Sequence, residues 1–351
     1  MATIKDVAKL ANVSLGTVSN CLNNTSAVRD STRARVLRAA AELGYKHRGT
    51  YLSLRRGEVR RTIGIIAEDL TMFNTPSIVS AIGRTAEEQG FGTILIDLRL
   101  AAEGVSLLDE FYYIDPARGA VNTLLSHDVE GIIYVGCQSR EIKHIATGYQ
   151  TPVAYAYCYS NEHNACSFVY DDENISCELM QHIIGHGHRT IGLIAGPEAS
   201  HHVRDRLVGY QKTLFDNGIL YNPRLVHFGD WESPQHGFLS AHKLWSAGAT
   251  AIFCMNDILA TGVIDYAHAN SISVPGRLSI AGFDNNPVSQ SVYPRLTTVA
   301  LPLQEIGAAV AGRLIELLAA GKMPAAPQLT TLPCRIVYRS SIAAAEKAGT
   351  R

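Results

Sequence analysis

The sequence predicts an all-α N-terminal domain followed by a larger α/β core with two lobes. Three observations support this fold class: two short amphipathic helices near the N-terminus, apolar strand-like runs that alternate with helical patterns from residue 62 onward, and a length of 351 residues. A chain of this length exceeds one typical hydrophobic core, so two or three domains are expected. Strands that alternate with helices form parallel sheets through right-handed crossovers.

Residues 3–22 are predicted to form two short helices joined by a tight turn. The first helix has an apolar stripe at helical spacing, made by Ile4, Val7, Ala8 and Ala11. Thr3 is expected to cap this helix, because Asp6 lies three residues on and can return the hydrogen bond. Asn12 tolerates a left-handed backbone and is expected to turn the chain, and Ser14 then caps the second helix.

The second helix is predicted to have an inward face and an exposed N-terminal half. The inward face consists of Leu15, Val18 and Leu22, and the exposed half carries Leu15, Gly16, Thr17, Ser19 and Asn20. A helix-turn-helix presents this half of its second helix to the major groove of DNA. The alternative interpretation of residues 3–22 is a small helical cap on a larger domain.

A third helix is predicted to begin at Asp30 or Ser31 and to end at Leu43, with Gly44 as its left-handed stop. Its inward residues are expected to be Val36, Leu37, Ala40 and Leu43. Residues 45–61 read YKHRGTYLSLRRGEVRR and are too short for a domain. They are either a flexible linker or a segment that becomes helical around 50–54 only on DNA.

The charge of the chain is unevenly spread. Residues 1–61 contain twelve Lys and Arg against four Asp and Glu, a net charge of +8, whereas the whole chain has a net charge of −1. The remainder therefore carries −9. Because phosphate contacts by Lys and Arg dominate nucleic-acid affinity, only the N-terminal part is expected to meet a polyanion.

The composition argues against several classes of protein. No apolar stretch approaches the roughly 18–20 residues of a membrane span, and the N-terminus lacks the apolar core of a secretory signal. The seven cysteines are scattered without a C-x-x-C pair, which favours reduced thiols over a disulfide framework or zinc ribbon. We therefore expect the chain to act in the cytoplasm, at the nucleoid, with no cofactor and no membrane partner.

The core is predicted to contain buried strands separated by helices. Strand-like runs occupy 62–70, 93–98, 131–136, 152–157, 190–196, 251–257 and 278–284, and an amphipathic helix is expected at 78–89. Five or six strands are expected before about residue 160 and the rest after it. Residues 101–118 interrupt this pattern and are interpreted as a surface excursion.

Several motifs together resemble the LacI/GalR family of bacterial transcription regulators. The N-terminal motifs are IKDVAKLANVSLGTVSNCLNN, STRARVLRAAAELGY and RTIGII, and later ones include SHDVEGIIYVG, GHGHRTIGLIAGP, RDRLVGY, MNDILATG, SVPGRLSIAGFDN and LTTV. The resemblance covers nearly all of residues 3–340. It implies a homodimer or tetramer whose protomers each have a helix-turn-helix, a hinge helix and a core like that of the periplasmic sugar-binding proteins.

The family pattern implies a division of the chain. Residues 1–46 form the helix-turn-helix domain, 47–61 the hinge helix or linker, 62–340 the effector-binding and dimerisation core, and 341–351 a tail. Lobe 1 is expected to comprise about 62–160 and 291–323, and lobe 2 about 161–290 and 324–340. The two lobes would close on a small effector, often a sugar or nucleoside-like molecule.

The resemblance implies a set of DNA contacts. Leu15, Gly16 and Asn20 occupy the base-reading positions, where Asn can pair with adenine, Leu can meet a thymine methyl group, and Gly offers no side chain. Phosphate contacts are assigned to Thr3, Ser14, Thr17, Ser19 and Asn23.

Leu54, followed by Arg55, falls where family hinge helices insert a leucine into the minor groove, and Leu52 is the alternative. His47, Arg48 and Tyr51 depart from the family's usual Pro, Asn and Ala, so the hinge is expected to pack less tightly.

The effector is expected beyond the carboxyl ends of the parallel strands. The polar residues there include the pairs Glu68-Asp69, Asn256-Asp257 and Asp284-Asn285. The resemblance implies that the effector contacts Met72, Phe73, Asn74, Arg206, Trp231, Asn256, Asp257 and Asp284. Tyr157 stands where a sugar-specific member has an acidic residue, so those sugar contacts do not carry over.

Each effector residue also has a structural interpretation. Arg206 and Asp284 could form an ion pair, Asn256 and Asp257 could cap the following helix, and Trp231 could belong to the core. A metal site is not favoured, although it is suggested by His182, His186, His188, His201 and His202. Residues 171–173 (Asp-Asp-Glu) suggest carboxylate catalysis but are interpreted as a solvated loop.

The sequence therefore predicts an effector-responsive, sequence-specific DNA-binding regulator, a repressor rather than an enzyme. Its partners are a palindromic double-stranded operator, a small sugar or sugar-like effector and a second copy of the chain. The alternatives are a sugar-binding protein and a sugar-processing enzyme without a DNA role. The first predicts a signal peptide and no basic arm, and the second predicts turnover of a sugar.

Overall fold

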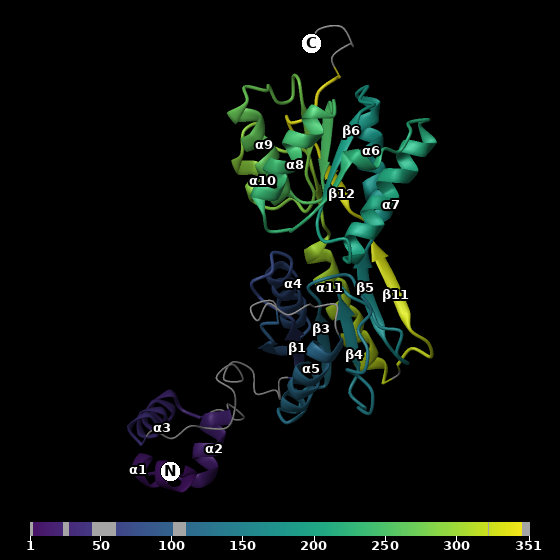
Figure 1. Ribbon diagram of the computed structural model, residues 1–351. Coiled ribbons are helices and arrows are strands. Elements are labelled where there is room, and N and C mark those ends of the chain that lie inside the picture. Colours follow the sequence, from purple (N-terminus) through teal and green to yellow (C-terminus); the bar gives the residue numbers. More distant parts are fainter. Residues whose placement is uncertain (1–2, 24–27, 44–60, 101–109, 322, 346–351) are drawn as a thin grey trace. The chain divides into compact units, whose positions relative to one another are not determined.

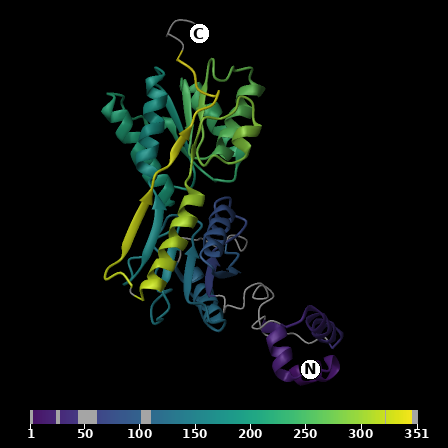
Figure 2. The ribbon, with the colours of Figure 1, turned by 180° about the vertical axis from the view of Figure 1, so that it is seen from behind.

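The chain forms two compact units in the computed structural model (Figures 1 and 2). The structure describes residues 3–23, 28–43, 61–100, 110–321 and 323–345. The head is Met1–Arg61 together with Gly90–Gly92, and the core is Thr62–Gln89 with Thr93–Arg351. In the described part of the chain, no helix has both the length and the apolar character that a membrane crossing requires.

The described residues of the head form three helices, α1 (Ile4–Ala11), α2 (Leu15–Asn23) and α3 (Asp30–Glu42). The turn chemistry predicted for it is confirmed. The Asp6 carboxylate accepts hydrogen bonds from the backbone N–H and the hydroxyl of Thr3, at 2.8 and 2.7 Å. Asn12 has a left-handed backbone with φ of 48°, and the Ser14 hydroxyl accepts the backbone N–H of Thr17 at 3.1 Å.

The head buries small side chains rather than all of the predicted ones. Val18 and Val36 are buried as expected, but Leu15 and Leu37 are each 44% exposed. Their expected inward places are taken by Cys21 and Ala39, each three residues after a buried valine. Small residues let short helices approach closely, so the larger leucines point outward. Gly44 and the hinge segment 47–60 lie outside the described residues.

Lobe 1 is built on a six-stranded sheet in the order β11-β5-β4-β3-β1-β2. Its strands are β1 (Thr62–Ala67), β2 (Gly92–Asp97), β3 (Gly131–Val135), β4 (Val153–Ala156), β5 (Cys166–Tyr170) and β11 (Gln328–Leu332). Its helices are α4 (Thr75–Glu88), α5 (Glu110–Leu125) and α11 (Leu303–Ala320). Helices α4 and α11 pack against each other and the sheet, whereas α5 packs against β1 (Figures 1 and 2).

Lobe 2 is built on a four-stranded parallel sheet in the order β7-β6-β8-β9. Its strands are β6 (Ile191–Ala195), β7 (Val226–Phe228), β8 (Ala251–Cys254) and β9 (Ser279–Ala281). Its helices are α6 (Asp172–Gly185), α7 (His201–Asp216), a 3-10 turn at Pro223–Leu225, α8 (Pro234–Ser246), α9 (Asp257–Ala269) and α10 (Val288–Ser291). Helix α6 packs on α7, and α8 packs on α9.

The chain passes between the lobes three times: after β5, after β10 (Thr298–Ala300) and between β11 and β12 (Arg335–Val337). Strands β10 and β12 pair antiparallel, and bridges join Thr297 to Ala281 and Ala300 to Asp284. The strand runs predicted for the core are confirmed in position, with their ends trimmed by a few residues.

The predicted lobe boundaries are wrong in three places. Strands β5 and β11 lie in the lobe 1 sheet, so lobe 1 continues to residue 170 and again through 328–332. Residues 291–300 belong with lobe 2, because Leu296 lies in its hydrophobic core. Among the described residues, four strands precede residue 160; the other two in this sheet are β5, which follows a short loop, and β11, which is contributed by a late crossing of the chain.

The segment 101–118 is not all a surface excursion. Its second half is the start of α5, where Tyr113 and Ala117 are buried one helical turn apart and continue to Val121 and Leu124. Residues 101–109 lie outside the described part. The seven cysteines are all free thiols, and those at 21, 137, 158, 166 and 254 are buried.

Candidate functional site

A cavity of about 380 Å³ lies in the core where loops that follow the strands of both lobes meet. Its lining includes Met72, Phe73, Arg206, Trp231, Asn256, Asp257 and Asp284, which are seven of the eight predicted effector residues. Asn74 is fully buried behind this wall, and its amide donates to the carbonyl of Gly136 at 3.4 Å. It supports the Met72-Phe73 loop instead of facing the cavity.

Arg206 is held in the cavity wall by an acidic residue that the sequence interpretation missed. Its Nε donates to Asp172 Oδ1 at 2.6 Å, and both side chains are 2% exposed. Its Nη1 donates to the carbonyl of Met255, and its Nη2 donates to the Tyr170 hydroxyl at 3.0 Å. Asp284 Oδ1 lies farther away, 3.6 Å from Nη2.

The expectation of a solvated loop at 171–173 is therefore wrong. Asp172 begins α6, while Asp171 caps that helix by accepting the N–H of Asn174. Burial opposes the ionisation of Asp172, but the charge of Arg206 and the hydrogen bonds from Arg206 and His202 outweigh it and hold the pKa of Asp172 below the usual range. The Asp-Asp-Glu run at 171–173 is typical of a helix N-terminus, where acidic side chains are favoured.

His202 joins the two lobes. Its Nδ1 lies 2.6 Å from Asp172 Oδ2, and its Nε2 accepts the backbone N–H of Ser139, in the loop after β3, at 3.1 Å. A ring nitrogen that accepts a backbone N–H carries no proton, so this imidazole is neutral. His202 lies four residues before Arg206 on α7, and this spacing was the signal that could have placed both on one face.

Trp231 is seated both in the cavity wall and against the lobe 2 core. A Cβ on Gly196 would lie 2.2 Å from the indole ring, so only glycine allows this close approach. Asn256 holds the same loop: its amide donates to the carbonyl of Trp231 at 3.0 Å, and its oxygen accepts the N–H of Leu259. Asn256 is thus the N-cap of α9 as well as a wall residue.

The two remaining acids of the predicted site, Asp257 at the start of α9 and Asp284 in the loop after β9, both line the cavity. Asp284 and Asn285 have positive φ values of 95° and 49°. Asp257 Oδ2 accepts the N–H of Asn286 at 2.7 Å, which fixes this strained loop. Burial raises the pKa of Asp284 to about 6, and burial together with Asp284 raises the pKa of Asp257 to about 8.

Lobe 1 contributes less charge to the cavity. Glu68 and Asp69 are fully buried and do not line it. Glu68 pairs with Arg140 at 2.6 Å, and Asp69 accepts the N–H and hydroxyl of Thr71, so both acids hold loops that reach the cavity. The lobe 1 residues that line it are Thr71, Met72, Phe73, Cys137, Gln138 and Tyr157.

The predicted DNA-contacting residues are described in part. Thr3, Ser14, Leu15 and Gly16 are exposed, and Thr17 and Asn20 are half-buried. Ser14 and Thr17 share a hydrogen bond of 2.8 Å, so a phosphate would meet them as a pair. Ser19 and Asn23 lie on α2, but their side chains are outside the described set, as are Leu54 and Arg55.

The histidines do not gather into a metal site in the part of the chain that the structure describes. His182 packs edge-on against His186, and His188 is buried against Thr250 and Ser279. His201 begins α7, where His202 faces the cavity. These contacts give each of the five a structural place.

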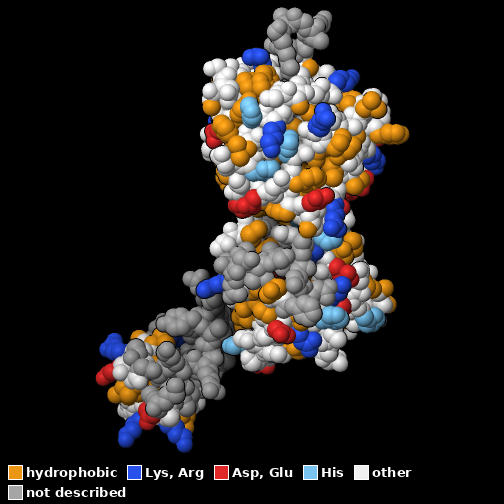
Figure 3. Space-filling model, in the orientation of Figure 1, with side chains coloured by type: hydrophobic (Ala, Val, Ile, Leu, Met, Phe, Trp, Pro, Cys, Tyr) orange, Lys and Arg blue, Asp and Glu red, His pale blue; other side chains and the backbone are white. Residues whose placement is uncertain are grey.

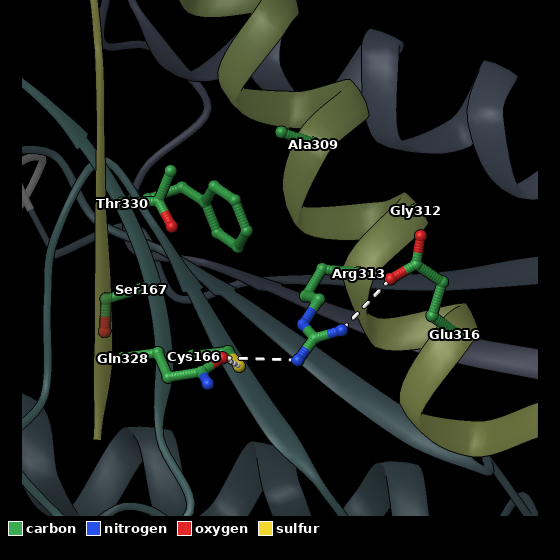
Figure 4. Close-up of a pocket in the computed structure, with 9 residues that line it drawn as sticks. Cys166, Ser167, Ala309, Gly312, Arg313, Glu316, Gln328 and Thr330 are labelled. Carbon is green, nitrogen blue, oxygen red and sulfur yellow. Dashed lines mark hydrogen bonds and ion pairs between the residues drawn. The ribbon is translucent and has the colours of Figure 1, made fainter. Parts of the chain in front are cut away.

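A second hollow of about 340 Å³ lies between β5, β11 and α11 in lobe 1 (Figure 4). Arg313 projects into it but is matched by Glu316 at 3.1 Å and bonded to Gln328 at 3.3 Å. None of the predicted effector residues lines this hollow. The cavity at Arg206 is therefore the candidate effector site.

A three-helix head with an exposed second helix, joined to a two-lobed α/β core with an internal cavity, defines a ligand-binding DNA regulator. Comparisons with known proteins agree. Residues 3–47 match the model for bacterial regulatory proteins of the lacI family, and residues 180–342 match a periplasmic binding protein-like domain.

The chain is 30% identical to the HTH-type transcriptional regulator GalR of Escherichia coli K12, over 86% of this chain and 85% of that protein. It is 29% identical to the HTH-type transcriptional repressor CytR of the same strain, over 97% and 96%. A solved lac repressor dimer bound to operator and the anti-inducer ONPF has a TM-score of 0.74 at 26% identity, covering 98% and 99%. The chain belongs to the lacI family and is a DNA-binding transcription regulator, not an enzyme.

Proposed function

We propose that the chain represses transcription as a homodimer on a palindromic operator, and that a sugar or sugar-like effector in the cavity changes its DNA affinity. The observation that most directly supports an effector role is the cavity at Arg206, because it is formed by loops of both lobes. A ligand that contacts both lobes changes how they sit against each other, which alters the spacing of the two heads in a dimer.

The relatives support this assignment. CytR is named as a repressor, and a relative from Shigella flexneri that is 30% identical is named the sucrose operon repressor. One lac repressor structure, 27% identical with a TM-score of 0.75, is titled as bound to ONPG in the repressed state. A sugar ring requires hydrogen-bond donors and acceptors for its hydroxyl groups and an aromatic face to pack on. In this chain Arg206 offers the donors, Asp284 the acceptors and Trp231 the aromatic face.

Base contacts are assigned to Leu15, Gly16 and Asn20, and phosphate contacts to Thr3, Ser14, Thr17, Ser19 and Asn23. The exposed N-terminal half of α2 supports this assignment. The wedge is assigned to Leu54 with Arg55. Operator binding places the protein at the nucleoid in the cytoplasm.

The DNA half of the proposal is tested by selection from a library of palindromic duplexes of about 14–20 base pairs, followed by titration in increasing salt. Binding is expected to fall steeply with salt. Deletion of residues 1–61 is expected to abolish duplex binding while effector binding survives. Asn20→Ala is expected to relax specificity at one base pair, and Asn270→Ala, at the exposed C-cap of α9 in the core, serves as the matched control. Equal duplex binding by the truncated chain would refute the assignment.

The effector half is tested by thermal shift with neutral sugars, sugar phosphates, sugar acids, amino sugars and nucleosides. A ligand at about 100 times its Kd stabilises the folded state by about 2.7 kcal/mol. A compound that raises the melting temperature must also change operator affinity. Conversion of a sugar to product would instead favour an enzyme, and no response to any compound would refute an effector role.

A further inference from the structure

We infer that the effector is a hydroxylated amine, such as an amino sugar, that binds as a cation, and that sugar phosphates and sugar acids are excluded. This inference rests on the proposed function, since it takes the cavity at Arg206 as the effector site. It goes further by naming the charge of the ligand. The charge of the ligand follows from which charged side chains in the cavity lining already have a partner of opposite charge.

The charge of Arg206 is already neutralised inside the protein. Asp172 accepts its Nε at 2.6 Å, and neither side chain is more than 2% exposed. Two further donors of the guanidinium are used by Met255 and Tyr170. Arg206 can still donate to a ligand hydroxyl, but its positive charge is balanced, so it cannot compensate an incoming phosphate or carboxylate.

The remaining charges in the cavity wall are negative. Of the described residues that line it, four are acids, Asp230, Glu232, Asp257 and Asp284, and the only permanent cation is Arg206. Asp257 keeps its proton at neutral pH, because its pKa is raised to about 8, so Asp230, Glu232 and Asp284 supply the negative charge. His202 adds no positive charge, because its Nε2 accepts the N–H of Ser139. After Asp172 has balanced Arg206, the lining retains an excess of carboxylates.

These acids occupy two depths. Asp284 is the inner one, with 11% of its side chain exposed, and it lies close enough to Arg206 for only a long ion pair of 3.6 Å. Asp230 and Glu232 flank Trp231 and are exposed. Figure 3 shows acidic side chains at the constriction between the lobes. A cleft lined by one sign of charge concentrates ligands of the opposite sign.

The pKa of Asp284 is also consistent with a carboxylate that lacks a full partner of opposite charge. Burial raises the pKa of Asp284 to about 6 even though Arg206 lowers it, which is expected for a carboxylate that lacks a full partner. An ammonium group near Asp284 would supply that partner. The aromatic faces of Trp231 and Phe73, the latter 39% exposed, can pack on a sugar ring or on the cation itself.

The test is isothermal titration of the full chain with matched sugars at pH 7.5 and low salt. The probes are glucose, galactose and mannose, their 2-amino forms, their N-acetylated forms, their 6-phosphates and their uronic acids. For at least one sugar, the amine is expected to bind about tenfold more tightly than the neutral parent. N-acetylation is expected to remove this preference, and the phosphates and uronic acids are expected not to bind.

A charge-removal variant separates electrostatics from shape. Asp230→Asn with Glu232→Gln is expected to reduce the preference for the amine over its neutral parent several-fold. Both residues are exposed, so the variant should fold. The matched control is Asp216→Asn with Asp265→Asn, which removes two exposed acids of lobe 2 away from the cavity lining and should leave the preference intact.

The outcomes distinguish the two levels of the proposal. If a neutral sugar binds as tightly as its amine, or a phosphate or uronic acid binds more tightly, the inference is overturned and the proposed function stands. If no amine binds, the inference is also overturned. The proposed function fails with it only if none of the neutral sugars or nucleosides binds or alters operator affinity.

Discussion

Two buried groups in the core each combine a carboxylate, an arginine and a tyrosine but differ in how completely their carboxylates are paired. The lobe 1 network consists of Glu68, Arg140 and Tyr134, and the cleft network consists of Asp172, Arg206 and Tyr170. In both, an arginine nitrogen lies 2.6 Å from a carboxylate oxygen and a tyrosine hydroxyl joins the group. Distance and burial therefore do not tell a structural ion pair from a functional one.

The two networks differ in whether every carboxylate oxygen has a close hydrogen-bond partner. Glu68 receives both terminal nitrogens of Arg140, the Tyr134 hydroxyl and the N–H of Cys137, so its two oxygens are saturated. The cleft network has a second carboxylate, Asp284, that is only loosely paired, and it faces a cavity. A loosely paired carboxylate next to an open space is available to a ligand. In the lobe 1 network both Glu68 oxygens are used, and although Arg140 Nε is buried without a hydrogen-bond partner, Arg140 does not line the cavity, so this network contributes only to stability.

The largest effect is expected for Arg140→Met. This change leaves Glu68 buried without its cationic partner, which typically costs about 3–5 kcal/mol in the free energy of unfolding. Urea unfolding of the full chain, followed by circular dichroism, measures this loss. Effector affinity per folded molecule should be unchanged. A loss below 1 kcal/mol would show that the lobe 1 network is not the structural element described above.

Arg206→Met is expected to have the opposite profile. Asp172 keeps His202 as a partner, so destabilisation should be smaller, about 1–3 kcal/mol. The variant should lose about 100-fold or more in effector affinity, because a charge-assisted donor and the positioning of Asp284 disappear together. Operator affinity without effector should stay near that of the wild type. Equal destabilisation by Arg206→Met and Arg140→Met would remove the distinction between the networks.

A pH effect of intermediate size is expected from Asp257 in the cleft. Its pKa is raised to about 8 by burial and by Asp284, with Thr298, Asn286 and Arg339 opposing the shift. The folded state thus binds a proton that the unfolded chain releases near pH 4. Its contribution to stability is present below pH 4 and is lost as the pH rises from about 4 to 8.

The comparison of wild type with Asp257→Asn isolates this contribution. The difference in unfolding free energy between pH 5 and pH 8.5 should be about 1–3 kcal/mol larger in the wild type, since Asn does not titrate. A wild type and Asp257→Asn pair with parallel pH profiles would contradict the assignment.

The two networks also show what sequence could predict. The strand runs, the turn at Asn12 and the cap at Ser14 depend on local chemistry, and they were predicted correctly. The effector residues came from family motifs, and all but Asn74 reach the cavity. Asp172 was missed because its partner lies thirty-four residues away on another helix, a contact that no local pattern encodes.

The lobe boundaries failed for the same reason. Strand β11 enters the lobe 1 sheet beside β5 after the chain has already built lobe 2, so its place depends on a distant pairing. Its sequence, QLTTL, is mostly exposed and lacks the apolar run that marked the other strands. Local periodicity identifies buried strands, but an exposed edge strand is specified by its neighbour.

The smallest expected effect comes from removing one hydroxyl from each network. Tyr134→Phe removes a donor at 2.7 Å from Glu68, and Tyr170→Phe removes the acceptor of Arg206 Nη2 at 3.0 Å. Each should cost about 0.5–1.5 kcal/mol in unfolding free energy. Only Tyr170→Phe should also weaken effector binding, by several-fold, because it frees the guanidinium to rotate. Titration calorimetry beside urea unfolding measures both quantities, and an equal effect of the two variants on effector affinity would mean that saturation does not separate the lobe 1 network from the cleft network.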